Sequence, residues 1–266
     1  MKHSFLSLLT VLTLFSCKNG EEVKGIQTPV EQEERKVEET RFPMEVSRMF
    51  EAHGGFKKWN SMRQLSYTLP KKNNNETHII DLKSRKSVIN ASNYTIGFDG
   101  NEVWMNKEGQ FPINKARFYH NLYFYFYAMP FILGDKGIKY EKTADLEFEG
   151  VKYPGYKISY DSNIGDSPDD NYFVYYDSET YLMKWLGYTV TYGGEGPSNE
   201  IHYINYSDWN KVNNLLLPAT LQWYSSENNL PKEPTSKQKF NLVSISKEKP
   251  DNKLFEKPID ALVGKK

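Results

Sequence analysis

The sequence predicts a mainly β (α+β) protein in which an antiparallel sheet wraps around a helix rich in aromatic side chains. Residues 118–131 contain eight aromatic side chains in fourteen positions, with no Gly and no Pro before Pro130. Such a helix must be buried or face an apolar partner, and it is too short to cross a bilayer, which takes ~20 apolar residues. Segments rich in Tyr, Trp and Val surround it and alternate with polar turn residues, as strands do. With 19 Tyr and 15 Phe, the core is expected to be aromatic.

The amino terminus has the features of an export signal. Lys2 and His3 precede a mostly apolar run at 5–15, and this pattern predicts a signal peptide over residues 1–16. The run 14–17, Leu-Phe-Ser-Cys, resembles the lipobox of bacterial lipoproteins, in which the cysteine is lipidated and becomes the first residue. Cys17 is the only cysteine of the chain, and lipidation accounts for it. The alternative is an ordinary secretory signal with a chance cysteine.

Residues 17–42 are expected to form the lipidated cysteine and a disordered tether. Seven glutamates and almost no apolar side chains lie between 18 and 41, so this segment buries too little surface to fold. By resemblance to lipoprotein sorting rules, Lys18 after the cysteine favours the outer membrane. The run 20–22, Gly-Glu-Glu, resembles acidic tags for export to the cell surface, although a solvated spacer explains the same charges. The predicted location is therefore the outer membrane, lipid-anchored, with the domain on the periplasmic face or the cell surface.

A helix is expected to open the folded part. Pro43 suits a first helical turn, and Val46, Met49 and Phe50 recur at helical spacing. The glycines at 54–55 end this helix as a left-handed cap would. A short second turn with Phe56 and Trp59 follows.

The rest of the chain reads as a meander of short strands. We expect strands at 65–69, 78–82, 87–91 and 94–98, a return strand from 103, and after the aromatic helix strands from 146, at 153–160, 172–176, 181–192, 201–206, 216–224 and 240–246. The dipeptide Asp99-Gly100 predicts a type I′ hairpin turn. Turns recur about every 8–12 residues, which favours antiparallel pairing.

Five segments carry a resemblance to a known family: His53-Gly54-Gly55 with Trp59, Phe98-Asp99-Gly100 with Val103-Trp104, residues 118–134, Trp185-Leu186-Gly187-Tyr188, and Leu215-Leu216-Leu217-Pro218 with Trp223-Tyr224. They resemble an uncharacterised family of Bacteroidetes lipoproteins over residues 43–258. That family is similar in layout to the LolA/LolB lipoprotein carriers, whose curved antiparallel sheet forms an open half-barrel closed by helices over an apolar cavity. The resemblance implies one LolA-like domain over 43–266, with an N-terminal helix and the aromatic helix plugging the concave face.

Several kinds of chemistry find no support in the sequence. The 34 basic and 34 acidic side chains balance, so there is no basic footprint for nucleic acid. The histidines after the signal peptide are far apart, at His53, His78, His120 and His202, and match no zinc spacing. The run 165–167, Gly-Asp-Ser, matches the start of a lipase and esterase family but lacks its downstream Asp-x-x-His, and a solvated loop is the simpler interpretation. No cofactor, metal or catalytic residue is predicted.

The remaining signal is aromatic and indicates either a ligand cavity or a core filled by its own rings. The residues expected to line a hydrophobic site are Trp104, Phe118, Tyr119, Tyr123, Phe126, Tyr127, Phe131, Trp185, Tyr188, Tyr203 and Trp223. With the anchor, they favour a lipoprotein that binds a lipid or acyl chain and takes part in envelope lipid or lipoprotein transport. The alternatives are a non-catalytic scaffold that binds glycan or protein through exposed aromatics, and a hydrolase acting on lipid or cell wall. The hydrolase would need His53 or His120 in a cleft beside a perturbed carboxylate.

Overall fold

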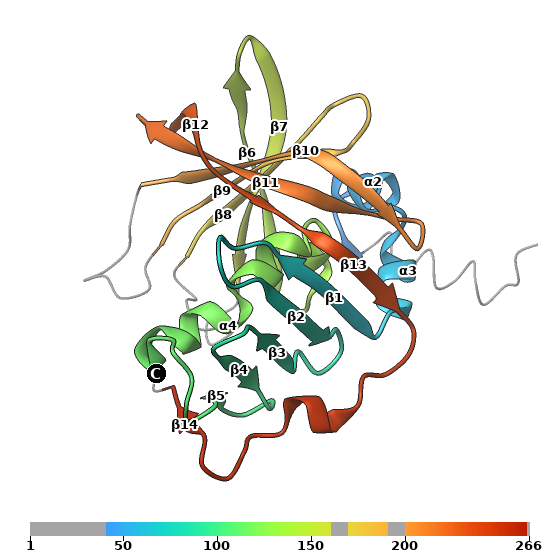
Figure 1. Ribbon diagram of the computed structural model, residues 1–266. Coiled ribbons are helices and arrows are strands. Elements are labelled where there is room, and N and C mark those ends of the chain that lie inside the picture. The colour runs from blue at the N-terminus through green and yellow to red at the C-terminus, as the bar shows by residue number, and fades with distance from the viewer. Residues whose placement is uncertain (1–40, 161–169, 191–199, 265–266) are drawn as a thin grey trace, which may run out of the picture. The chain divides into compact units, whose positions relative to one another are not determined.

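The computed structural model describes residues 41–160, 170–190 and 200–264, all of them within the unit Glu39–Lys266 (Figure 1). The predicted signal peptide, Cys17, the tether up to residue 40 and the 165–167 run lie outside the described residues. None of the described helices has both the length and the apolar character that crossing a membrane requires.

Two antiparallel sheets of seven strands each carry the fold. The first has the order β13 (Asn241–Ser246), β1 (Gln64–Leu69), β2 (Glu76–Asp81), β3 (Ser87–Asn90), β4 (Thr95–Phe98), β5 (Val103–Met105) and β14 (Leu262–Val263). The second has the order β12 (Leu230–Lys239), β11 (Leu215–Glu227), β10 (His202–Val212), β9 (Met183–Tyr188), β8 (Tyr172–Tyr176), β7 (Val151–Tyr160) and β6 (Ile138–Phe148). Within the described residues both sheets stay open, since no pairing joins their edge strands.

The expected single sheet is therefore divided in two, and Phe240 marks the division. Its backbone N–H donates to Ala219 O in β11 at 3.0 Å, whereas the next residue, Asn241, pairs with Thr68 in β1. The Phe240 ring is buried between Tyr67 and Tyr127. The chain thus passes from one sheet to the other through one residue that is anchored in the core.

Most strands lie within a few residues of their predicted positions, and the exceptions have physical reasons. The edge strand β12 was not predicted because it is polar and contains Pro231 and Pro234, which edge strands tolerate. The hairpin between β4 and β5 forms, but its predicted type I′ turn is wrong. Only Gly100 has positive φ there, at 100°, whereas Asp99 accepts the N–H groups of Asn101 and Glu102 with its side chain.

The N-terminal helix α2 (Met44–Ala52) and the short α3 (Phe56–Ser61) are present as expected. Gly54 and Gly55 separate them with φ values of 105° and 96°. A side chain at Gly54 would also place its Cβ 2.3 Å from Asn214 O. This position therefore requires glycine for both its backbone conformation and its close approach to the second sheet.

The aromatic helix α4 (Ile113–Tyr127) begins directly after Pro112, five residues before the aromatic run. It ends before Pro130, because the residue preceding a proline avoids the helical region, and a 3₁₀ turn η1 (Phe131–Gly134) follows. A second 3₁₀ turn, η2 (Asn252–Phe255), lies near the carboxyl end of the chain.

The main core joins both sheets with α2, α3, α4 and η1. The α4 ribbon crosses between the two sheets (Figure 1), and its buried residues share one apolar cluster with strands of both. A smaller cluster around Trp185, Tyr175, Tyr203 and Leu146 is separate from it. Trp185 belongs to the small cluster and its neighbour Leu186 to the main core, so β9 buries both of its faces.

Candidate functional site

One face of α4 is fixed to the first sheet. Ala116, Tyr119, Tyr123 and Tyr127 recur along this face at helical spacing. Ala116 packs against Ile89, Ile96 and Val103, and the Tyr127 ring lies 4.8 Å from that of Tyr67 in β1.

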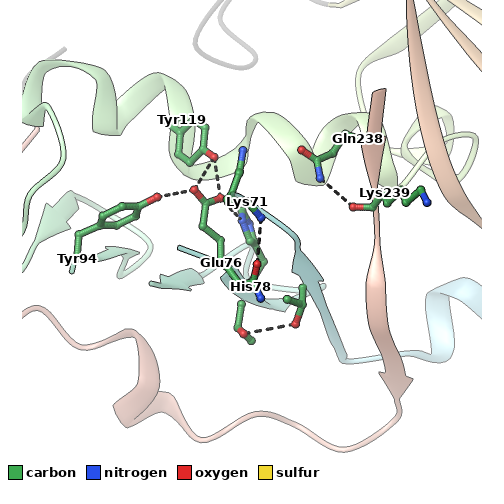
Figure 2. Close-up of polar contacts among 10 residues, drawn as sticks. Lys71, Glu76, His78, Tyr94, Tyr119, Gln238 and Lys239 are labelled. Atoms are coloured by element: carbon green, nitrogen blue, oxygen red, sulfur yellow. Dashed lines mark hydrogen bonds and ion pairs between the residues drawn. The ribbon is translucent and has the colours of Figure 1, made fainter. Parts of the chain in front are cut away.

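A buried carboxylate anchors this face (Figure 2). The Tyr119 hydroxyl donates to Glu76 Oε1 at 3.0 Å and to Oε2 at 2.7 Å, and the Tyr94 hydroxyl donates to Oε1. His78 Nε2 lies 3.2 Å from Oε2, two residues along β2 from Glu76 and on the same face of the strand. Burial alone would raise the pKa of Glu76, but the hydrogen bonds from His78, Tyr94 and Tyr119 outweigh it and hold that pKa below its usual value. The carboxylate is therefore ionised and ties α4 to the sheet.

Aromatic contacts complete this anchor. The His78 ring stacks on Tyr67 at a centroid distance of 4.9 Å, and burial lowers the pKa of His78 so that the ring is neutral. Lys71 Nζ lies 5.0 Å from the centre of the Tyr123 ring, close enough for a cation–π contact. We call Glu76, His78, Tyr94 and Tyr119 the Glu76 cluster.

The other face of α4 borders a cavity of about 540 Å³. Phe118, Asn121, Leu122 and Tyr125 recur at i, i+3, i+4 and i+7 and line it together. The remaining lining residues come from the same helix, the first sheet, the segment around η1, and the facing ends of β7 and β8: Ile80, Arg85, Ser87, Phe98, Arg117, His120, Phe124, Phe126, Met129, Ile132, Asp135, Lys136, Tyr160, Asp170 and Tyr172. The lining is thus mixed, with eleven apolar or tyrosine side chains and eight polar or charged ones.

Two of those polar groups form an ion pair. Arg85 Nη2 donates to Asp135 Oδ1 at 2.6 Å and to Oδ2 at 2.7 Å. The guanidinium also lies over the Phe124 ring, 5.1 Å from its centre. Burial raises the pKa of Asp135 in spite of the neighbouring Arg85. Arg85 and Asp135 therefore place a half-buried ion pair in the wall of the cavity.

His120 is the histidine that lines the cavity. Its Nδ1 is hydrogen-bonded to Arg117 O one turn earlier in α4, and its ring lies 5.2 Å from that of Phe98. Asp170 is another buried lining residue. In the described parts of the chain, no three His, Cys, Asp or Glu side chains gather as metal ligands would.

The structure brings some of the eleven predicted site residues together. Phe118 and Phe126 line the cavity. Phe126 extends this apolar surface, because its ring lies 5.1 Å from Tyr188 and 6.0 Å from Trp223. Trp223 Nε1 donates to the Tyr188 hydroxyl at 3.0 Å. Phe126, Tyr188 and Trp223 thus form one continuous aromatic group.

The other predicted residues lie elsewhere. Tyr119, Tyr123 and Tyr127 are on the sheet-facing side of α4, and Phe131 stacks on Trp59 with ring centres 4.8 Å apart. Trp104 covers Gly97 and donates Nε1–H to Phe255 O at 3.1 Å. Trp185 and Tyr203 belong to the separate small cluster. None of these seven is among the residues that line the cavity, and a ligand contact for them stays a prediction.

Sequence reasoning missed the polar end of the cavity. Arg85 and Ser87 flank the start of β3, and Asp135 follows η1. Polar residues are ordinary at the ends of helices and strands, so only the fold reveals that these three line one cavity. The signal available in the sequence was the isolated basic run 83–86, Lys-Ser-Arg-Lys, between two apolar strands.

The chain is similar in fold to several solved structures. These include a LolA superfamily protein from Nitrosomonas europaea at 7% identity and a TM-score of 0.46, covering 79% of this chain and 96% of that one. A DUF1329 family protein from Desulfovibrio piger has 8% identity and a TM-score of 0.44, covering 75% and 92%. A domain from Vibrio parahaemolyticus assigned to an outer membrane lipoprotein-sorting protein has 8% identity and a TM-score of 0.39, covering 73% and 88%.

Each of these TM-scores is below 0.5 and each identity is below 10%, so the likenesses carry no conclusion about function. A scan of protein-family models and a search of curated proteins found no match. The function proposed below therefore rests on the cavity and not on the neighbours.

Proposed function

We propose that this chain binds a hydrophobic ligand, a lipid or an acyl chain, in the cavity beside α4. The observation that carries the proposal is the cavity itself. Its volume of about 540 Å³ falls in the range of ~300–1,000 Å³ that small-molecule sites occupy. Its lining combines apolar and aromatic side chains with polar groups, as such sites do.

The exposed aromatics of α4 support the same proposal. Phe118 and Tyr125 keep 38% and 37% of their surface exposed, and both line the cavity. An apolar ligand would cover them. The scaffold alternative needs an exposed aromatic row on an outer face, and these two rings do not provide one.

The expected affinity is sufficient for a carrier. Each buried CH₂ contributes ~0.8 kcal/mol, so a twelve-carbon chain gains on the order of 9 kcal/mol before ordering costs. After those costs are subtracted, we expect a Kd in the micromolar range. A carrier needs binding of this strength, because a much tighter complex would release its ligand slowly.

The amino terminus supports a place in the cell envelope. Lipidation at Cys17 would anchor the domain to the outer membrane through the tether, on its periplasmic face or at the cell surface. There the domain would take lipid or acylated protein from the membrane and pass it on. Its role would be in envelope lipid or lipoprotein transport, and it would bind without catalysis.

Filling the cavity tests the proposal. Leu122 is half-buried and lines the cavity, so Leu122→Trp is expected to occupy ligand space while α4 stays docked through the Glu76 cluster. The matched control is Leu254→Trp in η2, where Leu254 is 42% exposed. We expect Leu122→Trp to weaken binding of radiolabelled palmitate at least tenfold and the control to leave it unchanged. Equal binding by the wild type and both variants would contradict the proposal.

A further inference from the structure

Two polar atoms in the cavity wall are buried and have no hydrogen-bond partner within the described part of the chain: Arg85 Nη1 and Ser87 Oγ. Ser87 is only 4% exposed. A buried donor without an acceptor is unfavourable, and most such groups in folded proteins are satisfied. Two of them in one cavity indicate an acceptor that the chain itself does not supply.

The backbone fixes both residues at this place. Arg85 has φ 62° in the turn between β2 and β3, and its N–H donates to Asp81 O at 2.8 Å. Ser87 is the first residue of β3, where it pairs with Ile80 on one side and Phe98 on the other. Ile80 and Phe98 also line the cavity. Ser87 is therefore held by a sheet that forms one wall of the cavity, and Arg85 is held by the turn that leads into this sheet.

The charged residues that line the cavity are Arg85, Arg117 and Lys136 on the positive side and Asp135 and Asp170 on the negative side. Arg41 and Lys83 also lie close enough to influence Asp135 electrostatically. Asp135 accepts hydrogen bonds from Arg85 Nη2, whereas Arg85 Nη1 has no partner among the described residues. This arrangement favours an incoming anion, because an ionised acceptor makes the stronger hydrogen bond to a guanidinium.

We propose that the cavity takes an anionic amphiphile, whose carboxylate or phosphate accepts hydrogen bonds from Arg85 Nη1 and Ser87 Oγ. The inference rests on the proposed function, because it assigns the headgroup of the same ligand. The tail lies along Phe118, Leu122 and Phe126, which line the cavity. The Phe124 ring beneath the guanidinium links the charged end of the cavity to the apolar end.

The test compares two ligands with the same tail. Calorimetry on the full chain carrying Cys17→Ala, which lacks the predicted lipidation site, would measure the Kd of decanoate and of decanol. We expect decanoate to bind at least about tenfold more tightly than decanol, as one charge-assisted hydrogen bond predicts. Arg85→Gln should weaken decanoate binding about tenfold or more and decanol binding far less. Ser87→Ala should produce a smaller loss in the same direction.

Further variants distinguish a lost headgroup contact from a loss of folding. One of them should strengthen decanoate binding, and two should leave it unchanged. Asp135→Asn removes the internal competitor for Arg85 and should strengthen decanoate binding. Two exposed residues serve as controls, Lys237→Gln on β12 and Ser244→Ala on β13, and should change neither affinity. The thermal midpoint of each variant is measured in parallel, so that a weak binder is known to be folded.

Three outcomes would overturn the inference. Equal binding of decanoate and decanol, with no selective effect of Arg85→Gln, would refute the anionic headgroup and leave the hydrophobic cavity standing. Binding of neither ligand would refute the proposed function as well. Binding of inorganic phosphate as tight as that of decanoate, and lost in Arg85→Gln, would show a site for a free anion instead of an amphiphile.

Discussion

Phe126 and Tyr125 are neighbours on α4, but their side chains have different surroundings. Phe126 is 7% exposed and packs on Tyr188 and Trp223, whereas Tyr125 is 37% exposed. The aromatic run predicts a helix that is buried or faces an apolar partner, and burial holds for Phe126, whereas Tyr125 is partly exposed and lines the cavity. At helical spacing the two residues differ by 100° around the axis, and only one of them points into the core.

The difference predicts unequal costs of an aspartate at the two positions. Phe126→Asp should lower the free energy of unfolding by at least the ~3–5 kcal/mol of a buried Phe→Ala change, because it also buries an unpaired carboxylate. Tyr125→Asp should cost about 1 kcal/mol, as partly exposed positions do. Urea unfolding followed by circular dichroism measures both. Equal costs would contradict the burial of Phe126 against the second sheet.

His53 predicts an acid-sensitive stability. Burial lowers its pKa from 6.5 to about 4, and its Nδ1 is hydrogen-bonded to Met49 O at 2.7 Å. The unfolded chain therefore binds a proton that the folded chain does not between these two pH values, so stability falls as the pH drops through this range. The effect is on the order of 3 kcal/mol.

The prediction is tested by measuring the free energy of unfolding of His53→Asn and of the wild type from pH 7 to pH 4. Asparagine keeps the hydrogen bond to Met49 O but cannot titrate, so this variant should have a shallower decline than the wild type. The slope that remains includes the share of His78, whose pKa is also lowered by burial. The same substitution at the half-buried His202 on β10 is the control, and its curve is measured in parallel. Parallel curves for His53→Asn and wild type would show that the pKa of His53 is the same in the folded and the unfolded chain, which would contradict its lowering by burial.

At the scale of elements, the position of α4 depends on the Glu76 cluster. Tyr119 supplies two of the contacts to Glu76, at 3.0 and 2.7 Å. Tyr119→Phe should lower the free energy of unfolding by ~1–3 kcal/mol, since it removes a donor from a buried carboxylate. Tyr123→Phe on the same face is the matched control and should cost much less. If both changes cost the same, the hydrogen bonds to Glu76 do not hold the helix.

The elements themselves were largely predictable, because local patterns determine them. Apolar residues at helical spacing before Gly54 and the alternation in 65–98 indicate their structures directly. The division into two sheets was not predictable, since it depends on Phe240 binding to β11 while Asn241 pairs with β1. The polar edge strand β12 was missed because its prolines and charges contradict the usual strand pattern.

Local sequence patterns likewise predict only part of the candidate site. The presence of Phe118 and Phe126 in the cavity lining was predictable from the aromatic composition of this segment. Which face of α4 meets the cavity is determined by Glu76 on β2, a contact between residues 43 positions apart that no local pattern encodes. Arg85, Ser87 and Asp135 are polar residues at the ends of elements, and only the tertiary fold makes them cavity residues.

At the scale of the whole molecule, membrane attachment is predicted to depend on Cys17. Cys17→Ala should release the protein from envelope membranes and leave its thermal midpoint unchanged, because the described helices and strands all lie within residues 44–263. Fractionation of host cells followed by thermal melting measures both properties. A variant that stays in the membrane fraction would contradict lipidation at this position.

The central claim is that the cavity beside α4 holds a hydrophobic ligand, and native mass spectrometry tests it most directly. The protein is purified from its own host's envelope, weighed intact, and then denatured and extracted for lipid. We predict a stoichiometric lipid or acyl ligand that leaves on denaturation and is depleted in Leu122→Trp. A clean ligand-free mass, with no uptake of added fatty acids or phospholipids, would contradict the claim.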